Sequence, residues 1–377
     1  MYNIILLGLV SLLTDISSEM VYPLLPLFLT TKLGASPAVV GLIEGIAEST
    51  ASLLKVFSGY FSDKMNKRKP LAILGYGGST IGKLFLYLAS SWWWVLLGRI
   101  IDRFGKGIRT APRDALIAES ADAGKLGHAF GLHRAMDTLG AAIGVLMAYY
   151  FFINYKGEYS IIFLLSLIPA FLGVLILFLV KEKKEKLIGK KNSLSLSWSQ
   201  LDGRLRAFLI ITFIFTLGNS SNQFLLLRAS NLGFDAASVI LLYLLYNVVY
   251  GVFSYPAGRL SDRIGRKKLL VLGYLFYGIV YFAFGFVKNM NYLWLLFGIY
   301  GLYIAFTEGV EKALVSEIAP PHLKATMIGL HATLVGIGLF PASFLAGLLW
   351  NTFGAQAPFY FGGFMGLIAA IALWMVL

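Results

Sequence analysis

Carboxylates four residues apart lie inside apolar stretches of this chain. Asp15 and Glu19 have this spacing within residues 3–30, and Glu44 and Glu48 have it within residues 37–61. In a helix, which turns about 100° per residue, side chains four positions apart share one face. A carboxyl group removed from water can take up and release protons near neutral pH. These pairs therefore predict proton-exchange sites on two helices.

A strongly charged face is predicted for residues 92–117. Six charged residues of this stretch fall within an arc of about 120° on a helix, namely Arg99, Asp102, Arg103, Lys106, Arg109 and Arg113. Each charge would cost about 2.5–3.5 kcal/mol at the centre of a lipid-facing helix. The face must therefore look into the protein or an aqueous cavity. Two uses stay open: ion pairs with the carboxylates, or binding of protons or an anionic substrate.

Other polar residues recur at helical spacing. His133 and Asp137 are four apart within residues 128–153, and Glu308 precedes Glu311 by three. The second half of the chain also contains Asn219, Asn222, Gln223 and His331. His133 and His331 occupy equivalent places in the repeat described below. A packing role inherited by both is at least as good an interpretation as proton relay.

The elements that position these residues are membrane-spanning helices. Of the 377 residues 58% are hydrophobic and 14% charged, and the mean hydropathy is +0.75, which is typical of a membrane protein. A spanning helix needs about 20 mostly apolar residues. Twelve such stretches follow one another at 3–30, 37–61, 70–90, 92–117, 128–153, 159–181, 205–229, 236–260, 268–288, 291–316, 325–350 and 356–377. We predict an all-α integral membrane protein with twelve transmembrane helices.

The positive charge is concentrated in three loops. The formal net charge is +13, and most of it lies around residues 62–70, 181–206 and 259–268. Basic loops stay on the cytoplasmic side, so we predict that both termini are cytoplasmic. This reading is favoured over nucleic-acid binding. The polar segment 182–204 is predicted to link an N-terminal six-helix bundle, 1–181, to a C-terminal one, 205–377.

The two halves are predicted to be repeats. The stretch GYFSDKMNKRK at 59–69 recurs as GRLSDRIGRKK at 258–268, and GLH at 131–133 recurs at 329–331. Each half would carry the same loop after its second helix. Parallel repeats of this kind place a substrate site between the halves near the bilayer midplane.

These loops resemble a signature of the major facilitator superfamily, and the resemblance covers the whole chain. The family uses this loop as a conformational latch, with an Asp and basic residues that pair with neighbouring helix ends. The matching residues are Gly59, Asp63, Lys64 and Arg68 in the first copy and Gly258, Asp262, Arg263 and Arg266 in the second. Small residues would let the second and eleventh helices approach closely.

The resemblance extends to proton antiporters. Residues 103–107, RFGKG, resemble the family's RxxQG pattern, whose arginine is linked to proton transfer, although Lys106 replaces Gln. Related drug antiporters often carry a protonatable acid on the first helix, which favours Asp15 and Glu19. We therefore assign proton coupling to Asp15, Glu19, Glu44, Glu48, Arg103 and Asp137. Substrate binding is assigned to Arg99, Asp102, Lys106, Arg109, Arg113, His133, Asn219, Asn222, Gln223, Glu308, Glu311 and His331.

No enzyme motif, cofactor or metal site is predicted. The chain has no cysteine and no GxxxxGK[ST], HExxH or GxSxG motif. We expect a monomeric secondary transporter in the cell inner membrane, working by alternating access as a proton antiporter that exports an amphipathic compound. The alternatives are a carrier of organic or phosphorylated anions that uses the basic face at 99–113, and a non-transporting membrane receptor.

Overall fold

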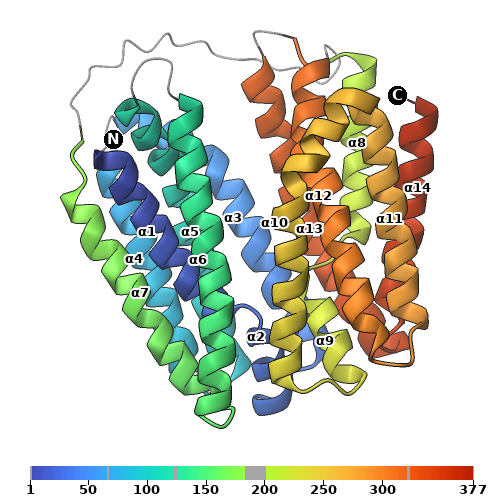
Figure 1. The fold of residues 1–377 in the computed structure, drawn as a ribbon, viewed down its shortest axis with the longest axis horizontal. Coiled ribbons are helices and arrows are strands. Elements are labelled where there is room, and N and C mark those ends of the chain that lie inside the picture. Colours follow the sequence, from blue (N-terminus) through green and yellow to red (C-terminus); the bar gives the residue numbers. More distant parts are fainter. Residues whose placement is uncertain (1, 66–67, 122–125, 183–200, 321–322, 377) are drawn as a thin grey trace. The chain divides into compact units, whose positions relative to one another are not determined.

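The computed structural model describes residues 2–65, 68–121, 126–182, 201–320 and 323–376, and nearly all of them are helical (Figure 1). The first half contains α1 (Tyr2–Val21), α2 (Leu25–Leu27), the π-helix η1 (Phe28–Lys32), α3 (Pro37–Met65), α4 (Arg68–Tyr87), α5 (Trp92–Ser120), α6 (Leu126–Asn154) and α7 (Tyr159–Leu179). The second contains α8 (Gly203–Gly218), α9 (Gln223–Asn231), α10 (Ala236–Ile264), α11 (Arg266–Phe286), α12 (Tyr292–Ile318), α13 (Lys324–Phe353) and α14 (Ala357–Val376).

The predicted membrane spans are present as helices. Ten helical segments of the described chain are long and apolar enough to cross a membrane. Two of them are interrupted: α1, α2 and η1 form the span Tyr2–Lys32, and α8 with α9 forms Gly203–Asn231. Helices α4 and α5 are of similar length but are not among the ten, and α5 carries the charged face. Together with α4 and α5, the ten candidate spans make twelve, so the predicted twelve-helix fold is confirmed.

Both interruptions have local causes. Helix α1 ends at Val21, just before Pro23, whose ring nitrogen has no hydrogen to donate to the preceding turn. Helix α8 ends at Gly218, and the backbone N–H of Asn219 closes its last turn by donating to the carbonyls of Phe215 and Thr216. Asn219 to Asn222 then leave the helical path before α9 begins. This break carries polar side chains at the middle of an otherwise apolar span.

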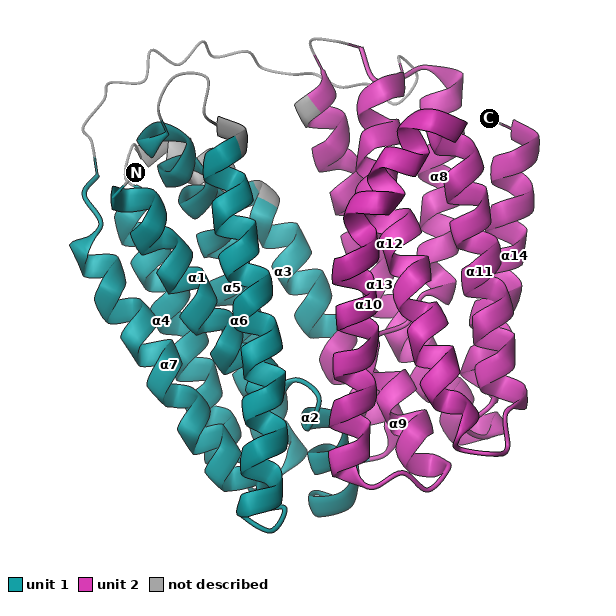
Figure 2. Ribbon diagram, in the orientation of Figure 1, with its two compact units in different colours: residues 1–35, 46–189 teal, residues 36–45, 190–377 magenta. Residues whose placement is uncertain are grey.

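The described chain divides into two compact units (Figure 2). One contains residues 1–35 and 46–189, the other residues 36–45 and 190–377. In the first, α1 packs against α6 and α7, and α4 packs against α5 and α7. In the second, α8 packs against α13 and α14, and α11 packs against α12 and α14. The same pairing of corresponding helices supports the repeat. The predicted domain boundaries stay predictions, and residues 183–200 of the linker lie outside the described chain.

Small residues bring neighbouring backbones together. A Cβ atom added at Gly82 of α4 would lie 2.5 Å from the carbonyl oxygen of Gly98 in α5. The first turns of α3, assigned to the second unit, meet α13 in the same way, because a Cβ at Gly347 would lie 2.7 Å from the carbonyl of Pro37. The predicted close approach of the second and eleventh helices is therefore confirmed.

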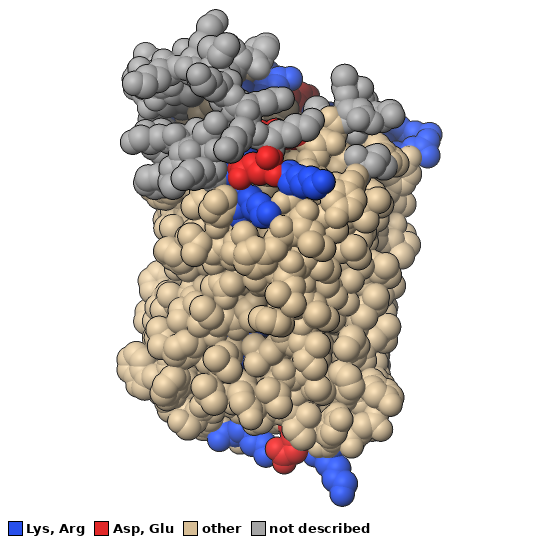
Figure 3. Space-filling model, turned by 90° about the vertical axis from the view of Figure 1, so that its left-hand side faces the viewer, with Lys and Arg blue, Asp and Glu red and all other residues tan. Residues whose placement is uncertain are grey.

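The outer surface suits a lipid bilayer. On the face drawn in Figure 3, Lys, Arg, Asp and Glu side chains gather at the two ends and leave an uncharged zone between them. Helix α7 exposes Ile168, Phe171 and Phe178 on its outer side. Apolar side chains of this size are stable at the surface when they face hydrocarbon rather than water.

Candidate functional site

The charged face of α5 points into the first unit. Arg99, Asp102, Arg103 and Arg109 are buried, and Lys106 and Arg113 are half-buried. Helix α4 covers this face at the glycine contact described above. The predicted inward orientation is therefore confirmed, and it follows from the cost of exposing charge to lipid.

Glu48 of α3 neutralises part of the basic face. Its carboxylate lies 3.0 Å from a guanidinium nitrogen of Arg103 and 3.8 Å from one of Arg99. Arg99 also lies 3.6 Å from the Asp102 carboxylate. This geometry supports the predicted ion-pair network. Glu48 and Arg103, both assigned to proton coupling, are thus partners of one another.

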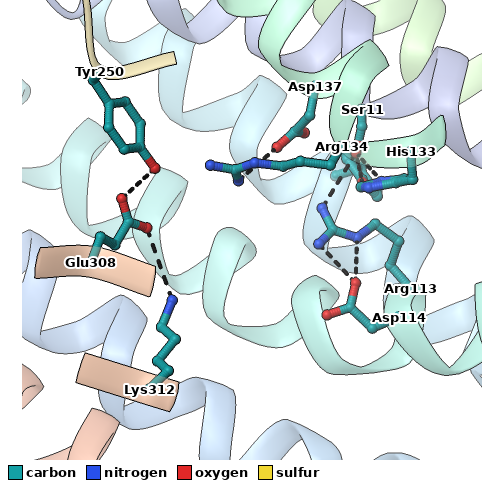
Figure 4. A network of polar contacts seen from close by, with 10 residues as sticks. Ser11, Arg113, Asp114, His133, Arg134, Asp137, Tyr250, Glu308 and Lys312 are labelled. Atoms are coloured by element: carbon teal, nitrogen blue, oxygen red, sulfur yellow. Dashed lines mark hydrogen bonds and ion pairs between the residues drawn. The ribbon is translucent and has the colours of Figure 1, made fainter. Parts of the chain in front are cut away.

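A pair of carboxyl groups joins α1 and α6. Asp15 and Asp137 interact electrostatically with each other, and so do Lys106 of α5 and Asp15. Arg134 lies 3.5 Å from the Asp137 carboxylate (Figure 4). The helices approach closely because of Gly144: a Cβ there would lie 2.5 Å from the carbonyl oxygen of Ile16. Two carboxyl groups can share a hydrogen bond only if one of them carries a proton.

Glu19 and Glu44 are the other two acids predicted to bind protons. Glu19 follows Asp15 by one turn of α1 and is half-buried. Glu44 is fully buried in the part of α3 that belongs to the second unit. Both acids have polar or electrostatic partners. Their predicted proton-coupling roles stay predictions.

His133 belongs to a hydrogen-bonded cluster with Ser11 (Figure 4). Its Nε2 atom lies 2.8 Å from the Ser11 hydroxyl, to which Arg113 also donates at 3.3 Å. Arg113 donates two further hydrogen bonds, of 2.9 and 2.8 Å, to the Asp114 carboxylate. Arg113 and His133 were both predicted to bind substrate, and the structure brings them together through Ser11.

Sequence reasoning missed Lys83 of α4. Its side chain is buried, its ammonium group donates to the Ser18 hydroxyl at 3.1 Å, and Asp102 is its largest electrostatic partner. A lysine within an apolar span is itself a signal of function or pairing. Ser11, Ser18 and Tyr76 were missed because hydroxyl groups carry no comparable signal.

The helix break between α8 and α9 forms an amide and tyrosine network. The Asn219 amide donates to the Tyr303 hydroxyl at 3.0 Å, and Asn222 donates to Tyr246 at 3.1 Å. The Tyr300 hydroxyl donates to the Asn222 carbonyl oxygen at 2.6 Å. Gln223 is fully buried, and neither atom of its amide group has a hydrogen-bond partner within the described chain. The three predicted binding residues are thus neighbours in sequence but differ in environment.

Glu308 and Glu311 of α12 also differ in environment. Glu308 is exposed, accepts a 2.5 Å hydrogen bond from the Tyr250 hydroxyl and lies 3.9 Å from the Lys312 ammonium group (Figure 4). Glu311 is half-buried and accepts a 2.9 Å hydrogen bond from the Tyr274 hydroxyl. His331 of α13 lies 3.6 Å from its other oxygen.

The structure describes the second copy of the predicted latch and part of the first copy. Arg266 lies 2.7 Å from Glu317 and 3.7 Å from Asp262, and its equivalent Arg68 forms an ion pair with Glu119. Gly258 lies in α10, and Asp262 and Arg263 near its end are exposed. Gly59, Asp63 and Lys64 lie in α3, and their side chains fall outside the described structure. The two halves thus share one ion pair at corresponding positions.

Comparison with known proteins agrees with this architecture. The family model of the Major Facilitator Superfamily matches residues 7–227 and 208–377. The uncharacterized MFS-type transporter MJ1317 of Methanocaldococcus jannaschii is 39% identical, over 99% of this chain and 94% of that protein. The multidrug resistance protein MdtH of Photorhabdus laumondii is 23% identical, over 96% of this chain and 91% of that protein.

The fold is also similar to a solved structure. The crystal structure of the nucleoside transporter NupG superposes with a TM-score of 0.80 at 14% identity, covering 100% of this chain and 99% of that one. Twelve helices in two repeats, the paired loop signatures and the match of the family model over the whole chain agree with one another. The chain therefore belongs to the major facilitator superfamily and is a multi-pass membrane transporter of that family.

Proposed function

We propose that this transporter exports an amphipathic compound in exchange for protons. The observation that carries the proposal is the interaction of Asp15 and Asp137, on helices α1 and α6 that approach closely at Gly144 of the first unit. A hydrogen bond between two such groups contains one proton, which can be released and replaced during a transport cycle.

The groups around the pair suit reversible protonation. When the proton leaves, two negative charges face each other, and this repulsion is unfavourable in a site shielded from water. Lys106 and Arg134 offset part of that repulsion from α5 and α6. The deprotonated form therefore stays accessible, while the protonated form is stabilised by the shared hydrogen bond. A site with two accessible protonation states is the requirement for coupling.

Export of an amphipathic compound is supported by a relative and by the second unit. MdtH, which is 23% identical, is named a multidrug resistance protein. The break between α8 and α9 groups amide groups with the aromatic rings of Tyr246, Tyr300 and Tyr303. Amide and aromatic groups together suit a ligand with apolar and polar parts.

The first test is a thermal-shift screen of the purified full-length protein at an acidic and an alkaline pH. Lipophilic cations, neutral amphiphiles and small carboxylated or phosphorylated anions would be compared. A ligand that binds only the folded state raises the apparent melting temperature. We expect cations or neutral amphiphiles to stabilise the protein at alkaline pH and to lose this effect at acidic pH. Stabilisation by anions alone would contradict the proposal.

The second candidate function is transport of organic or phosphorylated anions, and Arg109 favours it. Its guanidinium is buried, lies 4.4 Å from the centre of the Tyr76 ring and donates to the Ser79 hydroxyl. Within the described chain, no carboxylate lies within 4.0 Å of the Arg109 guanidinium. Arg99 and Arg103, by contrast, both lie within that distance of Glu48. An arginine without a carboxylate can bind an anionic substrate. Loss of anion-induced stabilisation in Arg109→Gln would support this function.

Orientation and assembly are also part of the proposal. The basic loops favour cytoplasmic termini and an insertion in the cell membrane, namely the inner membrane where the cell has two. A chain that contains both repeats can complete a transport cycle as a monomer by alternating access. Single cysteines introduced in place of Lys156 and of Lys268 would test the orientation with a thiol reagent that cannot cross the membrane, added to intact cells. With cytoplasmic termini, the cysteine at 156 should react from outside and the cysteine at 268 should not.

A further inference from the structure

A second group of buried ionisable residues lies in the second unit and is not used by the proton pair above. It consists of Glu311 on α12, Tyr274 on α11 and His331 on α13. The Tyr274 hydroxyl donates to Oε1 of Glu311 at 2.9 Å, and His331 Nε2 lies 3.6 Å from Oε2. The side chain of Glu311 is 14% exposed and that of His331 is 6% exposed.

No Lys or Arg of the described chain forms an ion pair with Glu311. The Lys312 ammonium group pairs with Glu308 and is 58% exposed. Within the described chain, no nitrogen of Lys or Arg lies within 4.0 Å of the Glu311 carboxylate. An isolated charge at this depth is costly. A proton held on the carboxylate or on the imidazole of His331 would remove this cost.

The surroundings contain few other ionisable groups. Helix α11 presents Tyr274, α13 presents His331, and α12 itself contributes Tyr303, Glu308 and Lys312. Helix α10 presents Tyr250, which is bonded to Glu308. Helix α8 presents Thr212 and Phe208, which do not titrate, and the Phe208 ring stacks on His331. The imidazole is thus the group able to exchange a proton with Glu311 near neutral pH.

The first unit provides an internal comparison. Tyr274, Glu311 and His331 each have an equivalent 198 positions earlier in the repeat. These equivalents are, in the same order, Tyr76, Arg113 and His133. There the histidine Nε2 has a 2.8 Å partner in Ser11, and the arginine is paired with Asp114. In the second unit a carboxylate replaces the arginine, and the buried His331 Nε2 has no hydrogen-bond partner within the described chain. A histidine kept only for packing would be satisfied like His133, so His331 requires another explanation.

We propose that Glu311 and His331, with Tyr274 as hydrogen-bond donor, form a second proton-binding site within the C-terminal half. The inference rests on the proposed proton-coupled function and adds a site to it. A proton from water binds the Glu311 carboxylate, which becomes a carboxylic acid facing the neutral imidazole of His331. Its release restores the carboxylate and the neutral imidazole. With both sites in use, each cycle carries about one proton more than the Asp15 and Asp137 pair alone would carry.

Infrared difference spectroscopy between acidic and alkaline buffer tests this without a known substrate. The full-length protein in lipid vesicles is compared with Glu311→Gln, His331→Gln, Asp15→Asn and the control Glu158→Gln, whose exposed side chain lies in the loop before α7. Helical circular dichroism and a single size-exclusion peak establish folding. We expect Glu311→Gln to lose one carboxylic acid C=O component, His331→Gln to shift the same component, and Glu158→Gln to retain it.

Each result separates the two proposals. A folded Glu311→Gln protein with an unchanged C=O spectrum would overturn the second site, as would loss of the component in Glu158→Gln. If Glu311→Gln does not fold, the absence of any shift in His331→Gln overturns it. A spectrum of Asp15→Asn without a lost component would contradict the proposed Asp15 and Asp137 site and leave the second site standing.

Discussion

At the scale of single residues, the partner of a charged group decides what it can do. Glu48 lies against two guanidinium groups, whereas Asp15 lies against another carboxyl group. The first arrangement stabilises a permanent negative charge, and the second favours a shared proton. Two acids that look alike in the sequence are therefore expected to behave differently.

Asp137→Asn tests this difference in function. Removing one carboxyl group leaves Asp15 without its proton-sharing partner, so pH-driven transport of a ligand found in the thermal-shift screen should fall at least about tenfold. Glu158→Gln, in the loop before α7, should retain wild-type rates. Transport is followed in proteoliposomes with an imposed pH gradient. Wild-type coupling in Asp137→Asn would remove the pair from the mechanism.

Arg228 shows how a buried cation can be structural. Its guanidinium donates to the carbonyls of Phe284, Gly285 and Val287 at the end of α11 and to the Asn231 side chain. Lysine cannot reproduce this fork of hydrogen bonds. We expect Arg228→Lys to lose about 2 to 3 kcal/mol of stability, measured as a lower apparent melting temperature. Arg204→Lys, at an exposed position, is the control, and equal melting temperatures would argue against the structural role.

At the scale of helices, close backbone contacts set the positions of the polar groups. Gly82 and Gly98 hold α4 on the charged face of α5, and Gly144 holds α6 on α1 near the carboxyl pair. Larger residues at these positions would separate helices that bring together groups far apart in the sequence.

Gly144→Ala tests the contact between α1 and α6. The added methyl group would meet the Ile16 carbonyl, and we expect a loss of about 1–3 kcal/mol in stability. Gly131→Ala in the same helix has open space around it and should be neutral or gain up to about 1 kcal/mol. Thermal unfolding in detergent compares the two variants. If both melt alike, the close contact is not important for stability.

At the scale of the whole molecule, the two halves share a scaffold but differ in polarity. Each half has the same helix pairings and an arginine–glutamate ion pair, Arg68 with Glu119 and Arg266 with Glu317. The Arg68 side chain is 9% exposed and that of Arg266 is 29% exposed. Equivalent pairs are therefore expected to contribute unequally to stability.

Replacing each arginine by glutamine tests that inequality. Removing one partner of the buried pair should cost about 3 kcal/mol in Arg68→Gln, because Glu119 keeps an uncompensated charge. Arg266→Gln should cost about 1 kcal/mol, because water screens the more exposed pair. Apparent melting temperatures give the order, with Lys324→Gln as an exposed control. A larger loss in Arg266→Gln would reverse the argument.

The sequence by itself determined the twelve spans, the repeat, the family and the inward orientation of the α5 charges. These follow from hydropathy, spacing and the cost of charge in lipid, which are properties of single helices. The tertiary structure alone decided that Asp15 interacts with Asp137, that Lys83 meets Ser18, and that, among the described residues, Nε2 of His133 has a hydrogen-bond partner while Nε2 of His331 has none. Helical periodicity assigns a residue to a face, but the neighbour of that face depends on how the helices pack.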